Sequence, residues 1–203
     1  MNNKNNLINR GGYSIKDGML STSQRNGIWT AKDAEHHQVS EKLAMWLSKY
    51  LPKDKPVLDF GCGIGYYVDY LEQNGFAAVG IDGNDETKIV CKNFVKQDLS
   101  KPFDLNVKGS VLSFETMEHI PKEFEHIAVQ TLVNHCDGIL IMSWASVGQP
   151  GIGHVNCKNG IDVVDLFSEY GFVLSAKHTM DIRLNVDKNC SWFERNLLVF
   201  IKD

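Results

Sequence analysis

The feature that most constrains this chain of 203 residues is the segment VLDFGCGIG, residues 57–65. An apolar run of strand length leads into three glycines at alternate positions, and a pattern with helical spacing follows. Glycine permits backbone conformations that a side chain forbids and lets a ligand lie against the main chain. In open α/β sheets, ligands bind beyond the carboxyl ends of the strands, where such a loop lies. The segment therefore predicts an α/β fold with a ligand site at this loop.

The residues around the glycines indicate the charge of that ligand. The spacing is G-x-G-x-G with Asp59 two residues ahead, and Tyr66 stands where dinucleotide-binding loops have their last glycine. A pyrophosphate favours a helix N-terminus without negative charge. Asp59 would repel a phosphate and attract a cationic ligand. An NAD-dependent oxidoreductase on a related fold is therefore a weaker alternative.

Strand and helix patterns alternate along the rest of the chain. We expect strands at residues 56–60, 77–81, 93–96, 110–114, 138–143, 172–178 and 196–201, and helices at 29–51, 66–73, 121–134 and 160–170. Thr30 or Asp33 would cap the first helix, and Pro52 would end it. Residues 179–195 show no clear helix, so the last two strands are expected to form an antiparallel pair. The predicted fold is a doubly wound, mostly parallel sheet of seven strands, with a final antiparallel strand and an N-terminal helical lid.

The composition of the chain indicates how it is divided into an arm and a domain and in which compartment it is expected. The first 28 residues are rich in Asn, Gly and Ser without an apolar period, so we expect a flexible arm or lid before a domain at residues 29–203. No apolar run is long enough to span a membrane, and the N-terminus lacks a secretory pattern. The five cysteines are odd in number and contain no CxxC pair, which predicts a cytoplasmic protein without disulfides or structural zinc. The oligomeric state is left open between a monomer and a homodimer.

Charge excludes one class of partner. Residues 56–203 carry twelve Lys and Arg against twenty Asp and Glu, whereas residues 1–55 carry nine against five. A body this acidic repels polyanions, so duplex nucleic acid is not expected as a partner.

Two further acids follow predicted strands. Asp82 ends the second strand, 21 residues beyond Gly61, where a carboxylate can accept hydrogen bonds from a ribose diol. Asp98 follows the short third strand, where it can accept from the exocyclic amine of adenine while Leu99 packs on the ring. With the glycine loop, these acids indicate a cationic ligand that contains adenosine.

In order and spacing, residues 40–145 resemble the class I, Rossmann-like S-adenosylmethionine-dependent methyltransferases, in particular members that act on small molecules and glycans. The resemblance implies that S-adenosylmethionine is the cofactor and that its methionine part lies on the glycine loop. It implies ribose binding by Asp82, adenine binding at Asp98 and Leu99, and a place beside the cofactor for Phe114 and Glu115. The expected cofactor-binding residues are Asp59, Gly61, Cys62, Gly63, Gly65, Asp82, Gly83, Asp98, Leu99, Phe114 and Glu115.

The resemblance also bears on the methyl acceptor. Members that methylate amines of nucleic acids carry Asn or Asp, two prolines and an aromatic residue after the fourth strand, whereas this chain has Phe114-Glu115-Thr116-Met117. Glu118-His119 resembles small-molecule and glycan-type members. We therefore expect methyl transfer to a small molecule or sugar, at oxygen rather than nitrogen. The alternative is a partner or sensor subunit that binds the cofactor without catalysis.

Candidate catalytic residues follow the fifth strand. The loop QPGIGHVN, residues 149–156, resembles a subset of methyltransferases in which His-Val-Asn is completed by a late Arg and Trp, here Arg183 and Trp192. A neutral His154 would accept a proton from a hydroxyl, Asn156 would orient it, and His119 is a further candidate. His154 can equally fasten the loop, and His119 can pack or cap. His36 and His37 could also reach the site, although a solvated helix face is the simpler interpretation.

A metal is not expected. Catechol-type chemistry would need two or three convergent carboxylates or amides near the acceptor. Glu115, Asp137 and Asp162 are available, but their spacing does not identify a site.

Overall fold

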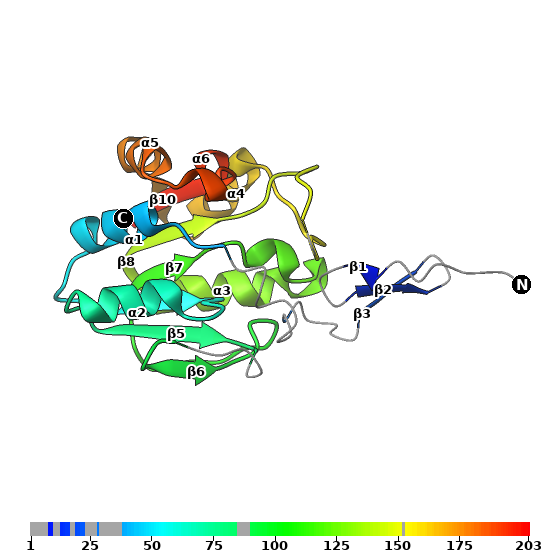
Figure 1. The fold of residues 1–203 in the computed structure, drawn as a ribbon, viewed down its shortest axis with the longest axis horizontal. Coiled ribbons are helices and arrows are strands. Elements are labelled where there is room, and N and C mark those ends of the chain that lie inside the picture. The colour runs from blue at the N-terminus through cyan, green and yellow to red at the C-terminus, as the bar shows by residue number, and fades with distance from the viewer. Residues whose placement is uncertain are drawn as a thin grey trace, which may run out of the picture.

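The computed structural model describes residues 38–84, 90–151 and 153–203, together with Ile28 and the backbone of three short strands before residue 23. One sheet has the strand order β6-β5-β4-β7-β8-β10-β9 (Figure 1). Its strands are β4 (Val57–Phe60), β5 (Ala78–Asp82), β6 (Phe94–Lys96), β7 (Gly109–Ser113), β8 (Cys136–Ser143), β9 (Phe172–Leu174) and β10 (Leu197–Lys202). The first five pair in parallel, and β10 is antiparallel to both β8 and β9. The predicted mostly parallel, seven-stranded sheet with a final antiparallel strand is confirmed.

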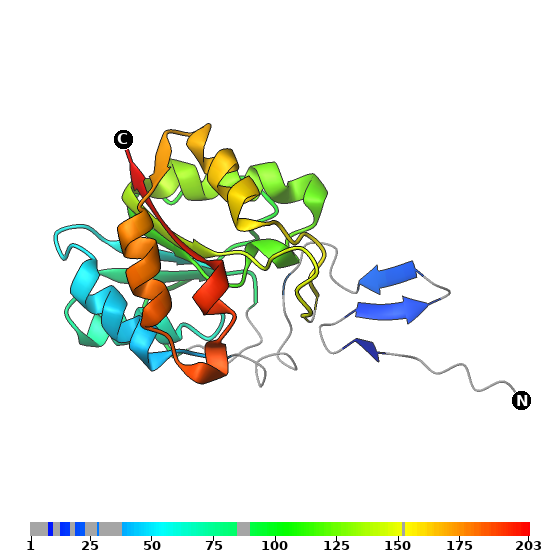
Figure 2. The same cartoon turned by 90° about the horizontal axis from the view of Figure 1, so that it is seen from above.

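Helices cover both faces of the sheet (Figure 2). One layer holds α1 (Glu41–Tyr50), α2 (Tyr66–Gln73), α5 (Ala176–Leu184) and α6 (Phe193–Asn196), and the other holds α3 (Glu125–His135) and α4 (Gly160–Ser168). Three 3₁₀ turns, η2 (Met117–His119), η3 (Lys122–Phe124) and η4 (Lys188–Cys190), join them. Each layer covers its own apolar core, one containing Leu47 and Leu71 and the other Leu132 and Phe167. Both faces of the sheet are buried, which explains why β4 and β7 are buried along their whole length.

The register of the central strands positions the site. Val57 of β4 is paired with Ala78 of β5 on one side and with Ser110 of β7 on the other. Parallel strands in this register end at the same edge of the sheet. The loops after β4, β5 and β7 therefore meet there, as the glycine segment predicts.

Two predicted elements differ in the structure. The first helix begins at Glu41, because Ser40 is extended and its hydroxyl caps the helix, whereas the sequence predicted a start at Trp29. Residues 29–37, which include the predicted caps, lie outside the described residues. The predicted strand to His178 was wrong: β9 ends at Leu174 and α5 follows. Only Thr179 and Ile182 of α5 are buried, so this helix leaves almost no apolar period in the sequence.

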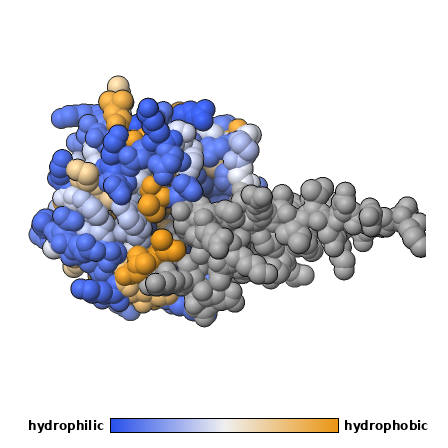
Figure 3. Space-filling view, in the orientation of Figure 1, coloured by the Kyte–Doolittle hydropathy of each residue, from blue (hydrophilic) through white to orange (hydrophobic). Residues whose placement is uncertain are grey.

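The N-terminal segment contains β1 (Ile8–Asn9), β2 (Tyr13–Lys16) and β3 (Met19–Thr22), which pair as an antiparallel three-stranded sheet. The division of the chain at residue 28 stays a prediction. On the face seen in Figure 3, hydrophilic groups dominate the coloured surface and apolar groups form small clusters. No helix in the described residues is long and apolar enough to cross a membrane.

Ser40 links the start of α1 to a distant loop. Its Oγ accepts a hydrogen bond from the Leu43 N–H at 3.2 Å and one from the Asp187 N–H at 3.0 Å. We expect Ser40→Ala to lower the free energy of unfolding by about 1–2 kcal/mol, because these buried donors lose their acceptor. Urea unfolding measures the change. Ser48→Ala, on the same helix, is the control and should change stability by less than about 0.5 kcal/mol; an equal loss in both variants would contradict the capping role.

Candidate functional site

A cavity of about 350 Å³ opens at the carboxyl edge of the sheet. It is lined by most of the residues that the sequence singled out: Asp59, Gly61, Cys62, Gly63, Asp82, Gly83, Leu99, Phe114, Glu115, His119, His154 and Trp192. Segments after β4, β5, β7 and β8 thus contribute to one cavity.

The glycine loop passes very close to the loop after β7. Gly61 has a φ of 82°, and a Cβ placed on it would lie 2.1 Å from Oγ1 of Thr116. Thr116 in turn donates a hydrogen bond to the Phe114 carbonyl at 3.0 Å. A residue with a side chain at position 61 would therefore force the two loops apart, which explains the glycine.

Asp59 lies at the end of β4 in the wall of the cavity. Its side chain is 1% exposed, and neither carboxylate oxygen has a hydrogen-bond partner among the described residues. Burial, with the nearby charge of Asp82, raises the pKa of Asp59 to about 7. A buried carboxylate without partners is costly, so this position favours a proton or a bound cationic group.

Asp82, at the end of β5, holds the turn of the glycine loop. Its two carboxylate oxygens accept hydrogen bonds from the Gly63 N–H at 2.9 Å and the Asn84 N–H at 2.8 Å. Burial raises its pKa, although these hydrogen bonds oppose the shift. Each oxygen has a second lone pair, so Asp82 can also accept from a ligand in the cavity.

Glu115 has a strained backbone, with a φ of 48°. Its N–H donates to the Ser143 hydroxyl, and that hydroxyl donates back to Oε1 of Glu115 at 2.8 Å. Burial raises the pKa of Glu115 to about 7. Strain of this kind outside glycine is common at functional sites.

The rings of two predicted residues, His119 and His154, are in contact in the cavity wall. The centroids of His119 and His154 lie 5.3 Å apart, in an edge-to-face arrangement. Nδ1 of His154 lies 3.3 Å from the Gln149 carbonyl, and Nδ1 of His119 lies 3.1 Å from the Gly153 carbonyl. Burial lowers the pKa of His154, although the Gln149 carbonyl opposes the shift. The His154 ring is therefore neutral at pH 7 and can offer a nitrogen lone pair.

Four predicted residues do not line the cavity. Gly65 begins α2, and the Asp98 carboxylate binds Ser100 and Lys101. The Asn156 amide donates to Glu125 at 2.9 Å, and Arg183 donates to the Leu197 carbonyl. Asn156 thus fastens the loop after β8 to α3, and its predicted role in orienting an acceptor stays a prediction.

Other residues of the site were not predicted. The cavity wall also contains Gln38 and Val39 before α1, Tyr66 and Tyr67 of α2, and Thr116, whereas Gln149 belongs to the predicted loop 149–156. Beside it, Glu118 is completely buried. Aromatic residues right after the glycine loop were a usable signal, whereas the burial of a glutamate leaves no mark in the sequence.

Comparisons with known proteins agree with this architecture. A family model described as a methyltransferase domain matches residues 35–176. No curated protein matches the chain. Among solved structures, magnesium protoporphyrin IX methyltransferase from Synechocystis, with bound SAH, is similar at a TM-score of 0.60, with 20% identity over 85% of each chain. The sugar N-methyltransferase KedS8 from Streptoalloteichus is similar at 0.61, with 15% identity over 80% of this chain and 87% of that one.

The raised pKa of Asp59 gives a prediction about stability. Since the folded chain holds this proton more tightly than the unfolded chain, the stabilisation is present at acid pH and is lost as the pH rises from about 4 through about 7. We expect Asp59→Asn, which cannot ionise, to become more stable relative to the parent by about 1 kcal/mol per pH unit over that range.

Urea unfolding of both proteins without ligand, at pH values from about 4 to about 8, measures this difference. Taking the difference cancels the titration of groups that do not interact with Asp59; Asp82, whose charge acts on Asp59, does not cancel in this way. A difference that does not change with pH would show that Asp59 is ionised throughout.

Proposed function

The chain belongs to the methyltransferase domain family, and we propose that it transfers a methyl group from S-adenosylmethionine to an oxygen of a small molecule or sugar. The family match covers residues 35–176, which include the whole predicted cofactor site. Support for the donor and the acceptor class comes from the similar structures, one with bound SAH and another described as a sugar N-methyltransferase.

The observation that carries the proposal is the unpartnered carboxylate of Asp59 in the cavity wall. S-adenosylmethionine has a cationic amino group and a sulfonium and no phosphate, so it fits an acidic wall that would oppose a dinucleotide. Asp59 and the glycine loop would hold the amino-acid part. The remaining lone pairs of Asp82 would accept from the ribose hydroxyls, and Leu99 would pack on the adenine.

The acceptor is assigned to the part of the cavity wall where the rings of His119 and His154 meet, and Trp192 lines the same cavity. When bound, S-adenosylmethionine supplies an electrophilic methyl group. The chain then has to orient the acceptor hydroxyl, exclude water and receive the hydroxyl proton. In the metal-free protein we assign proton acceptance to Nε2 of His154, because its Nδ1–H is directed at the Gln149 carbonyl.

Trp192 is proposed to orient the acceptor. Its indole Nε1–H is buried without a hydrogen-bond partner among the described residues, and the ring lines the cavity. An unpaired buried donor is unfavourable until a ligand oxygen accepts from it.

The proposed reaction is tested by incubating the purified protein with S-adenosylmethionine and a panel of hydroxylated small molecules and sugars. We expect S-adenosylhomocysteine to form with at least one acceptor. We also expect Asp82→Asn to weaken S-adenosylhomocysteine binding about 10- to 100-fold in calorimetry, because a charged acceptor is lost.

Asp162→Asn, an exposed acid on α4, is the matched control and should bind normally. Tight cofactor binding without turnover of any acceptor would instead favour a non-catalytic binding subunit. Binding of NAD in place of S-adenosylhomocysteine would overturn the proposal.

Trp192→Phe tests the acceptor end separately. The variant keeps an aromatic ring but loses the N–H, so we expect KM for the acceptor to rise about tenfold. Affinity for S-adenosylhomocysteine, measured in parallel, should be unchanged. A loss of cofactor affinity with normal KM would place Trp192 at the cofactor instead.

A further inference from the structure

Glu118 is, like Asp59, a buried acid whose carboxylate has no hydrogen-bond partner among the described residues. It lies on η2, and its side chain is 0% exposed. The charge of its neighbour Glu115 raises the pKa of Glu118 further, and the two carboxyl groups lie close enough to share a proton. A carboxylate in such a position needs compensation by a cation or a proton.

His154 faces this carboxylate. Its Nε2 lies 4.0 Å from Oε1 of Glu118, which is too long for a hydrogen bond. Two ligand atoms that each lie about 2.1 Å from one metal ion can be up to about 4.2 Å apart. The separation therefore lets both atoms bind the same ion.

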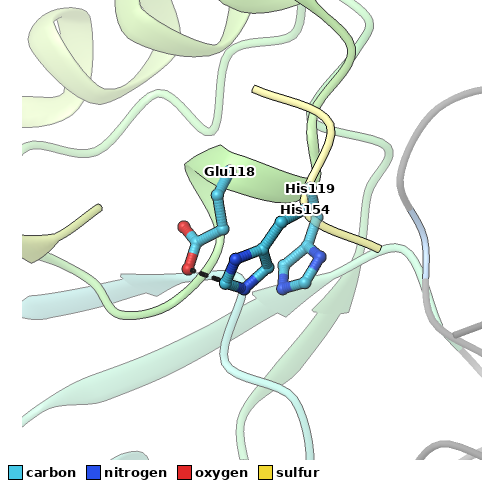
Figure 4. A group of neighbouring side chains, drawn as sticks. All are labelled: Glu118, His119 and His154. Carbon is cyan, nitrogen blue, oxygen red and sulfur yellow. Dashed lines mark ion pairs between the residues drawn. The ribbon is translucent and has the colours of Figure 1, made fainter. Parts of the chain in front are cut away.

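His119 supplies a third ligand atom. One ligand atom from each of Glu118, His119 and His154 lies within 4.8 Å of the others (Figure 4), so the side chains have to close by roughly half an ångström for all three to reach one ion. Nδ1 of each ring is within hydrogen-bond distance of a backbone carbonyl, of Gly153 or of Gln149. Metal-binding histidines usually have such a bond on the nitrogen that does not bind the metal, because it fixes the ring and its tautomer.

The backbone holds these three residues together. The N–H groups of Val155 and Asn156 both donate to the Glu118 carbonyl at 2.9 Å, so the loop after β8 is attached to η2. Gly151 makes room for the ring, since a Cβ there would lie 2.1 Å from Nε2 of His154. The arrangement is thus built by two segments that are separate in sequence.

We propose that Glu118, His119 and His154 bind a divalent transition-metal ion beside the cavity. Two imidazoles and one carboxylate favour Zn²⁺, Fe²⁺ or similar ions over Mg²⁺, which prefers oxygen ligands and retained water. The sequence predicted no metal, because the spacing of the available acids Glu115, Asp137 and Asp162 does not identify a site. That expectation is the opposite of this proposal.

The role of the ion rests on the proposed function, whereas its binding does not. His119 and His154 line the cavity, so an acceptor hydroxyl there can reach an ion that they hold. Coordination lowers the pKa of the hydroxyl, which then releases its proton to water. With the ion bound, His154 is a ligand and no longer the proton acceptor.

The test titrates Zn²⁺ alone into the full chain after chelator treatment, with calorimetry as the readout and Mg²⁺ alone as comparison. We expect one Zn²⁺ to bind per chain, and Glu118→Gln and His154→Gln each to weaken binding about 100-fold or more. His126→Gln, an exposed histidine on α3, is the matched control and should bind normally. Co²⁺ absorption in the parent protein reports imidazole coordination independently of activity.

Three results would overturn the proposal: no stoichiometric binding, equal binding by the parent and both variants, or preference for Mg²⁺. Equal binding would place the ion on a surface histidine or cysteine. Calorimetry of S-adenosylhomocysteine with the metal-free protein separates the two proposals. Methyl transfer by that protein at an undiminished rate would remove the catalytic role of the ion and leave the proposed function intact.

Discussion

The close contact between the loops after β4 and β7 is the constraint on which the site depends. A Cβ on Gly61 would lie 2.1 Å from the Thr116 hydroxyl, so the chain can make this contact only through glycine. Asp82 fixes the same loop from the other side through the Gly63 N–H. The ends of β4, β5 and β7 are thereby held together, and Asp59 and Glu115 line one cavity. Asp82 and Glu115 are partly used in holding this edge together, whereas the carboxylate of Asp59 has no partner among the described residues and is left for a ligand.

The sequence predicted the part of the fold that depends on local pattern. The bounds of α2 agree with the predicted residues 66–73, because a glycine loop precedes the helix and Asn74-Gly75 ends it. The strands of the central sheet were predictable because burial on both faces requires continuous apolar runs. α5 was missed since only two of its residues are buried, so its stability comes from contacts with β10 and α6 that no local pattern shows.

The residues of the site also fall into two groups, those that local sequence pattern predicts and those that depend on long-range contacts. Asp59 and Asp82 were predictable because their position relative to the glycines is fixed by one strand and one crossover. The contact between Glu118 and His154 was not, since these residues are 36 apart in the chain and meet only because β7 and β8 are neighbours. Asn156 was expected at the acceptor, but its amide is used by Glu125, a long-range contact that composition does not reveal.

Glu125, close to Glu118 in the chain, is a carboxylate that side chains of the protein stabilise. Burial alone would raise the pKa of Glu125, but hydrogen bonds from Lys122, Asn156 and Lys158 lower it. Glu118 is seven residues away and more deeply buried, yet no lysine or side-chain amide among the described residues is directed at it. The groups near its carboxyl are the backbone N–H groups of Glu118 and Ala145 and the acidic side chain of Glu115. The loop from residue 153 to 158 contributes to both surroundings, and its one lysine, Lys158, lies at Glu125 together with Lys122. Their placement at Glu125 leaves Glu118 facing imidazole nitrogens, and such a donor set is suited to a metal ion rather than to an internal salt bridge.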